Sequence, residues 1–215
     1  MSWECDGLEG TEVEGPAEHD AQPTFELCPE AAGATGETGE SDGIGEMGNG
    51  GEAGAIEDHA EIQGSEIAGF QQSIEDVNPG FDPFDPESPF NTNCSSCALA
   101  TELRLSGVDP EAVAGPENIA PTGKEMSALT GMEQVELTPE QIEDYARLQG
   151  PGYHGIVGFD YTVGGGGHWV NVATGAHGDV YAIDSQNSTV EPWHDFVDRY
   201  ITETKHWDLS IRRER

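Results

Sequence analysis

The sequence predicts an α+β protein in which a helix precedes an antiparallel sheet, behind a disordered acidic leader. Three observations predict it. Residues 1–70 contain 18 Asp and Glu residues and no Lys or Arg. Helix-capping signals follow between residues 91 and 150, and alternating apolar patterns typical of strands dominate after residue 154. The 215-residue chain is therefore expected to divide into a leader, residues 1–70, and a folded domain, residues 71–215.

The leader is rich in glycine and negative charge, as in the TGETGE and GNGGEAG runs. Ordering a residue costs about 1 to 2 kcal/mol of backbone entropy, which a segment with few large apolar side chains does not recover by burial. We expect residues 1–70 to be disordered. Its composition favours a solvated linker over an acidic docking tail or a mimic of nucleic acid.

The net charge of −34 limits the choice of partners. Phosphate backbones and anionic bilayers repel such a chain, so we expect neither nucleic acid nor a membrane surface as a partner. The chain contains only two lysines but 42 acidic residues, and this balance is typical of halophilic proteins. The start MSWECDGLEGTEVE lacks the basic and apolar regions of a Sec-type signal peptide, and no long apolar run follows, so a soluble protein is expected.

The domain is expected to begin with an irregular strap over residues 77–90, VNPGFDPFDPESPF, because its four prolines disfavour both a helix and a central strand. Phe81, Phe84 and Phe90 are its predicted anchors on the core.

Two helices follow from capping signals. Asn93 precedes CSSCALATELRLSG, which predicts a helix over residues 94–106 that ends before Gly107. Thr138, with proline next and Gln141 three residues on, forms a capping box that predicts a helix to about residue 149.

The remaining elements are predicted from apolar periodicity. Alternation predicts strands over residues 156–163, 168–174 and 179–184, joined as an antiparallel meander. An apolar helical face covers residues 196–201, and a last strand covers residues 207–211.

Cysteines supply the first candidate for chemistry. Cys5 and Cys28 lie in the leader without partners at useful spacing, so no disulfide scaffold is predicted. Cys94 and Cys97 lie where a polar loop becomes a helix, and a helix N-terminus favours the reactive thiolate. A CxxC pair can also bind zinc or act as a redox dithiol, but zinc needs two further ligands and no second CxxC or HxxxH follows. We expect no metal and no cofactor.

His168 and Asp184 are the candidates for a general base and its partner. His168 follows four glycines and opens the strand HWVNVAT, and Asp184 ends the next strand. A carboxylate on the neighbouring strand can bind the far ring nitrogen of a histidine and fix its tautomer. The order Cys, His, Asp therefore predicts a catalytic triad.

The ordered motifs NCSSCALATELRLSG, PGYHGIVGF and GHWVNVATGAHGDVYAIDSQ, with VNPGF upstream, resemble the papain-fold toxin family, whose members are described as toxin glutamine deamidases. The resemblance covers about residues 75–190 and implies a papain-like fold. Carried over residue by residue, it implies the following: Cys94 or Cys97 as nucleophile, His168 as base, Asp184 as orienting acid, and Asn171 and Gln186 as motif neighbours.

The resemblance implies a toxin or effector that deamidates glutamine in a protein substrate. Protease and transglutaminase activities use the same three residues and stay open, as does an inactive papain-like module kept for binding. It also implies delivery to a target cell and an immunity or secretion partner.

The two cysteines are ranked by comparison with papain-like enzymes in general. Their nucleophile commonly follows another cysteine three residues earlier and precedes small residues, which favours Cys97 and would place Asn91 near an oxyanion donor. The pairing of Asn93 with Cys94 favours Cys94 instead. We take Cys97 as the prediction and keep Cys94 as the alternative.

Overall fold

The computed structural model describes residues 51–85 and 87–212, with side chains from residue 59 onward. The rest of the predicted leader, residues 1–50, lies outside the described residues. The helices are α1 (Gly51–Ser73), the 3-10 helix η1 (Pro89–Asn91), α2 (Cys94–Leu105), α3 (Gly123–Thr130), α4 (Pro139–Gln149) and α5 (Trp193–Tyr200). The strands are β1 (Glu133–Glu136), β2 (His154–Tyr161), β3 (Gly167–Thr174), β4 (Val180–Asp184), β5 (Thr189–Pro192) and β6 (Thr204–Ile211).

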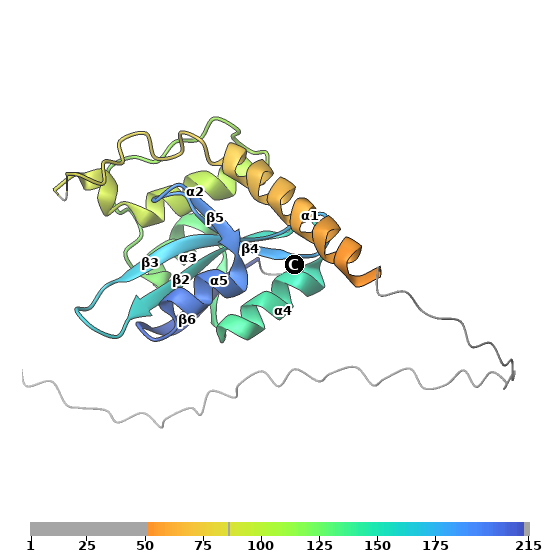
Figure 1. The fold of residues 1–215 in the computed structure, drawn as a ribbon. Coiled ribbons are helices and arrows are strands. Elements are labelled where there is room, and N and C mark those ends of the chain that lie inside the picture. The colour runs from red at the N-terminus through yellow and green to blue at the C-terminus, as the bar shows by residue number, and fades with distance from the viewer. Residues whose placement is uncertain (1–50, 86, 213–215) are drawn as a thin grey trace, which may run out of the picture. The chain divides into compact units, whose positions relative to one another are not determined.

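One six-stranded sheet organises the domain, and every neighbouring pair of strands is antiparallel. The strand order is β1-β6-β2-β3-β4-β5, so β2 and β3 lie at the centre. Helix α2 lies on one side of the sheet, and α4 and α5 lie on the other (Figure 1). The predicted α+β class is confirmed. None of the described helices is both long and apolar enough to cross a bilayer.

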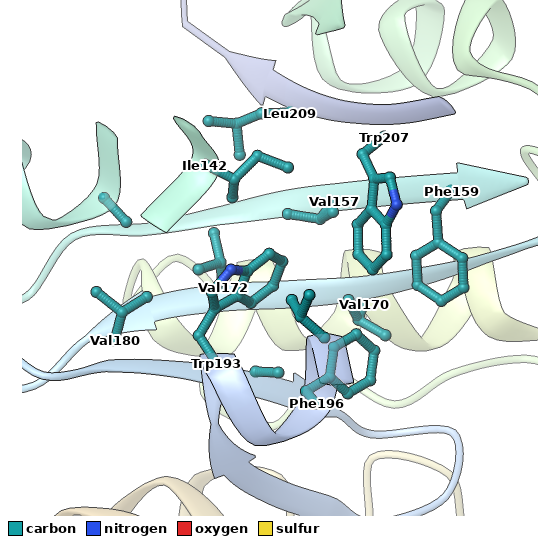
Figure 2. Packing of buried hydrophobic residues seen from close by; sticks show 13 residues of the cluster. Ile142, Val157, Phe159, Val170, Val172, Val180, Trp193, Phe196, Trp207 and Leu209 are labelled. Atoms are coloured by element: carbon teal, nitrogen blue, oxygen red, sulfur yellow. The ribbon is translucent and has the colours of Figure 1, made fainter. Parts of the chain in front are cut away.

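The larger core fills the space between the sheet and helices α4 and α5. Trp193 and Phe196 of α5 meet Phe159 of β2 and Trp207 of β6, and Val170 of β3 belongs to the same cluster (Figure 2). Burying each such side chain stabilises the fold by about 1.5 to 3 kcal/mol. This aromatic cluster fixes the sheet from which the site residues project.

The opposite face of the sheet packs on α2. Ala98 and Ala100 of α2 are buried, and small side chains let the helix approach the strands closely. Met126 of α3, Ile156 of β2 and Trp169 of β3 complete the packing around the first turns of α2. The small-residue sequence CSSCALA therefore places the start of α2 against the sheet.

Helices α2 and α4 and strands β2, β3, β4 and β6 form within a few residues of their predicted positions. The predicted capping box of α4 is present, with Thr138 and Gln141 bonded reciprocally. The prediction missed three short elements, α3, β1 and β5. The two strands have four residues each, too few for alternation to show. Helix α3 carried a readable signal, because Thr122 and Glu125 form a second capping box.

The predicted boundary of the leader at residue 70 is wrong, because residues 51–70 belong to helix α1. The prediction used composition and charge alone, which carry no information on contacts between residues that are distant in sequence. The ring of Phe70 lies 5.5 Å from that of Tyr181, and Ile74 just beyond the helix is 1% exposed. Glu66 accepts a 2.7 Å hydrogen bond from the Tyr181 hydroxyl. These contacts with the sheet offset the entropy cost of ordering the helix.

The described residues of the strap, 77–85 and 87–90, are irregular, as predicted, and the strap leads into η1. Phe90 packs against Gly80, where a Cβ atom would lie 2.3 Å from the ring. The prediction that Phe84 is an anchor is wrong, because that residue is 93% exposed. Its backbone N–H donates to the Asp82 carboxylate at 2.9 Å, and this Asx turn forms the tip of the strap.

Candidate active site

A cavity of about 580 Å³ opens where the first turn of α2 meets the beginning of β3. Four of the predicted site residues line it. They are Asn91, Cys94, His168 and Gln186.

His168 and Asp184 form a buried pair, with Nε2 and Oδ2 2.9 Å apart. Burial by itself would lower the pKa of His168, but the charge and hydrogen bond of Asp184, with a contribution from Cys94, raise that pKa above its ordinary value of 6.5. Burial would likewise raise the pKa of Asp184, but His168 and Asn187 hold it below its ordinary value of 3.8. The structure therefore favours a protonated imidazole on an ionised carboxylate.

Asp184 is held by the turn that follows β4. Asn187 Nδ2 donates to Oδ2 at 2.7 Å, and the backbone N–H of Gln186 donates to Oδ1 at 3.2 Å. The carboxylate thus has fixed partners besides the imidazole. It can orient the ring and balance its charge without being protonated itself.

Cys94 is the first residue of α2, and its side chain interacts with the His168 ring and helps to raise the pKa of that ring. Asp184 occupies Nε2 of that ring, which leaves Nδ1 as the nitrogen for the thiol. Cys94, His168 and Asp184 therefore form one continuous chain of contacts. A protonated imidazole beside a thiol favours the thiolate, which is the attacking species.

Cys97 lies one turn further along α2, about 4.5 Å along the axis, and is 1% exposed. It packs with Ile74 and Ile183 in the core, and burial, with the charges of Asp184 and Cys94, raises its pKa far above the ordinary range. Cys97 does not line the cavity. The geometry therefore favours Cys94 as the nucleophile candidate, whereas the sequence comparison favoured Cys97.

The side chain of Asn93 is the centre of a polar network next to the first turn of α2. Asn93 Nδ2 donates to Asn78 Oδ1 at 3.1 Å and to the Gly115 carbonyl at 2.8 Å. Its Oδ1 accepts from Cys97 Sγ at 3.4 Å and from Gln186 Nε2 at 3.5 Å. With its side chain committed to this network, Asn93 makes no capping hydrogen bond to α2. The backbone N–H groups of the first turn are therefore left without a side-chain cap.

The two other predicted neighbours have structural partners. Asn91 reaches the cavity, but its Nδ2 donates to the carbonyls of Asp82 at 2.7 Å and Asp85 at 2.9 Å. Both amide hydrogens thus tie η1 to the strap, and the predicted oxyanion role is unsupported. Asn171 is fully buried on β3 and donates to the Ala98 carbonyl at 3.2 Å, which fastens the strand to α2.

Sequence reasoning missed the walls of the cavity and part of its support. Phe159 packs edge-on against His168, with ring centroids 5.7 Å apart, and Trp169 lies beside it on the lining. Asp160 and Asp208 make one wall acidic, and burial, with the charges of Glu136 and Asp160, raises the pKa of Asp208. No local pattern marks these residues, because they converge only when β2 pairs with β3 and β6.

Within the described residues, no group of three or more His, Cys, Asp or Glu side chains is arranged to hold a metal ion. No family model matches the sequence, and no curated protein matches it.

Proposed function

We propose that the protein is a cysteine-dependent amidohydrolase that deamidates glutamine side chains in a protein substrate. Cys94 is the nucleophile, His168 the general acid and base, and Asp184 the orienting acid. The observation that carries the proposal is that Cys94 and His168 line the same cavity and interact there, while His168 pairs with the buried Asp184. This arrangement is the Cys–His–acid form of a triad, recognised by geometry rather than by sequence position.

In the first half of the reaction the Cys94 thiolate attacks the carboxamide carbon. The carbonyl π electrons move to oxygen and form a tetrahedral oxyanion. As the oxyanion collapses, the C–N bond breaks and the His168 imidazolium gives its proton to the departing nitrogen, which leaves as ammonia. A thioester on Cys94 and a neutral imidazole remain.

In the second half water replaces ammonia. His168 takes a proton from the water as its oxygen attacks the thioester carbon, the C–S bond breaks, and the carboxylic acid leaves. The Cys94 thiolate and the His168 imidazolium are restored. Glutamine thereby becomes glutamate, and one water is consumed for each ammonia released.

Two groups are placed to stabilise the oxyanion. The first-turn N–H groups of α2 carry no side-chain cap, and the N-terminus of a helix favours negative charge. Gln186 lines the same cavity, and its Nε2 uses one hydrogen in a long 3.5 Å contact with Asn93. The second amide hydrogen is available to a bound carbonyl oxygen.

The cavity suits a glutamine side chain. Its volume of about 580 Å³ is within the range of small-molecule sites, and its aromatic walls can contact the two methylene groups. Cys94, His168 and Gln186 are among the polar residues of the lining.

We also propose that the fold is papain-like. A helix that carries the nucleophile at its start packs across an antiparallel sheet, and the sheet supplies the histidine and the acid from adjacent strands. The sequence resemblance and this arrangement both support the proposal.

Intact-mass spectrometry of glutamine-rich test proteins separates the three open activities. Deamidation adds about one mass unit per site, proteolysis gives two fragments, and transglutamination needs an added amine. We expect the one-unit product with the wild type and with Cys97→Ser, and none with Cys94→Ala. Fragments alone would replace deamidation by proteolysis, and full activity of Cys94→Ala would remove the proposed nucleophile.

A further inference from the structure

A second hollow, the α2 groove, lies outside the active-site cavity. It has a volume of about 750 Å³ and is lined by α2, the segment 106–119 and the end of α3. Among the described residues nine large apolar side chains are exposed, and five of them line this groove. Single exposed apolar residues are common, but a gathered patch marks an interaction site. The five are Leu103, Val108, Val113, Ile119 and Leu129, with exposed fractions from 39% to 73%.

The lining of the groove is acidic. It includes Asp109, Glu111 and Glu117, which are exposed, and the buried Glu102, which faces Arg212 at 3.4 Å. Among the described residues of this lining, Arg212 is the one basic residue. An apolar groove with negative charge around it complements a segment that carries both apolar and basic side chains.

The α2 groove adjoins the active-site cavity through the segment 117–119. Glu117 and Ile119 line the groove, whereas Asn118 between them lines the cavity. This segment is fixed to the first turn of α2, since Ser95 Oγ donates to Asn118 Oδ1 at 2.5 Å and Ser96 Oγ donates to the Glu117 carbonyl. The groove and the cavity that Cys94 lines are therefore separated by this one segment.

We propose that the α2 groove is a docking site for an apolar segment of the protein substrate that carries lysine or arginine. The proposal rests on the proposed function, because it assigns the groove to that enzyme's substrate. Docking there would hold a glutamine of the same chain near the cavity and raise its local concentration.

Charge disfavours the other occupants. Residues 1–50 of this chain hold 13 acidic residues and no Lys or Arg, so they would bring negative charge to an acidic surface. A second copy carries the same net charge of −34, and an anionic bilayer is repelled for the same reason.

Binding is tested with the full-length Cys94→Ala variant, which separates docking from turnover. The probe is a fluorescent leucine–lysine peptide with an amphipathic helical pattern, followed by anisotropy. Leucine–glutamate and serine–lysine peptides of the same pattern test the need for positive charge and for apolar side chains. We expect the leucine–lysine peptide to bind at least about tenfold more tightly than either.

Groove variants locate the binding. The pair Val108→Ser and Val113→Ser, and separately Glu111→Lys, should each weaken binding of the leucine–lysine peptide by about fivefold or more. The matched control is Leu148→Ser on α4, where the residue is 83% exposed, and it should bind as the parent does. Equal binding by all four proteins, or equal binding of the leucine–lysine and serine–lysine peptides, would overturn the proposal.

Turnover by the otherwise unaltered enzyme is then measured on a glutamine peptide with and without the leucine–lysine segment. The segment should lower KM by about tenfold, the groove variants should remove that gain, and kcat should not change. Hydrolysis of both peptides with equal KM would overturn the docking site and leave the proposed function standing. Groove-dependent binding without hydrolysis of either peptide would overturn the proposed function and, with it, the assignment of the groove to a substrate.

Discussion

His168 Nε2 lies 2.9 Å from Asp184 Oδ2, and the two residues are 8% and 3% exposed. Water therefore cannot readily replace either partner, and a buried charge left alone is costly. This contact joins β3 to the end of β4 and engages Nε2 of the ring, which leaves Nδ1 for Cys94. The proposed catalysis and the local stability thus depend on one pair.

Asp184→Asn is expected to lower kcat by about three to four orders of magnitude, because an amide does not stabilise the imidazolium or the required tautomer. Asn187 and the Gln186 N–H hold the side chain from the turn, so the chain should still fold. Steady-state kinetics and far-ultraviolet circular dichroism measure the two effects. Asp198→Asn makes the same charge change on the exposed face of α5 and should keep full activity. An unfolded Asp184→Asn chain would mean that Asp184 is primarily structural.

The stability difference between wild type and Asp184→Asn should depend on pH. The lowered pKa of Asp184 stabilises the fold fully above the ordinary value of 3.8, and this contribution is lost as pH falls through the folded-state pKa. The raised pKa of His168 contributes its full stabilisation of the fold at pH values below the ordinary pKa of 6.5. This contribution is lost as pH rises through the folded-state pKa. Urea titrations should therefore show the largest difference, about 1 to 3 kcal/mol, between these two pH values. A difference that is constant from acid to alkaline pH would contradict the buried ion pair.

Iodoacetamide should modify Cys94 before Cys97. Cys94 faces the cavity beside His168. Cys97 is enclosed in the core, and its raised pKa keeps its side chain protonated and therefore unreactive. Peptide mapping after brief labelling identifies the modified residue. His168→Ala should slow labelling of Cys94, because it removes the neighbouring imidazolium. Fast labelling of Cys97 in the folded chain would restore the choice made from sequence.

Gly158→Ala should disturb the cavity, because a Cβ atom at Gly158 would lie 2.4 Å from the Trp169 ring. We expect overpacking to lower the free energy of unfolding by about 1 to 3 kcal/mol. Activity should also fall, because Trp169 is next to His168 on β3. Thermal unfolding and kinetics measure both. Gly69→Ala in α1 is the control, since nothing lies within 4 Å of the added atom and alanine favours a helix. Equal effects of the two substitutions would mean that close packing at Gly158 is unimportant.

Phe70→Ala tests whether α1 belongs to the folded domain. The substitution removes the ring that packs 5.5 Å from Tyr181 and should lower the free energy of unfolding by about 1 to 3 kcal/mol. Gln72→Ala, at an exposed position of the same helix, should leave it nearly unchanged. Urea denaturation compares the two. If Phe70→Ala is as stable as wild type, the original boundary at residue 70 regains support.

The sequence by itself determined the elements whose signals are local. The capping box at Thr138 and the alternation through β3 and β4 predicted their elements, because caps and periodicity act within a few residues. The same local reading placed His168 and Asp184 on adjacent strands, which the structure pairs as expected.

Tertiary structure alone decided what depends on distant contacts. Cys94 and Cys97 are equivalent in a helix pattern, and only the position of α2 against β3 brings the first to His168 and encloses the second. Helix α1 has a weak pattern of its own and is ordered beside Tyr181, which is more than a hundred residues away. A residue's local sequence fixes its backbone preference, but its neighbours in space fix its exposure, its pKa and its chemistry.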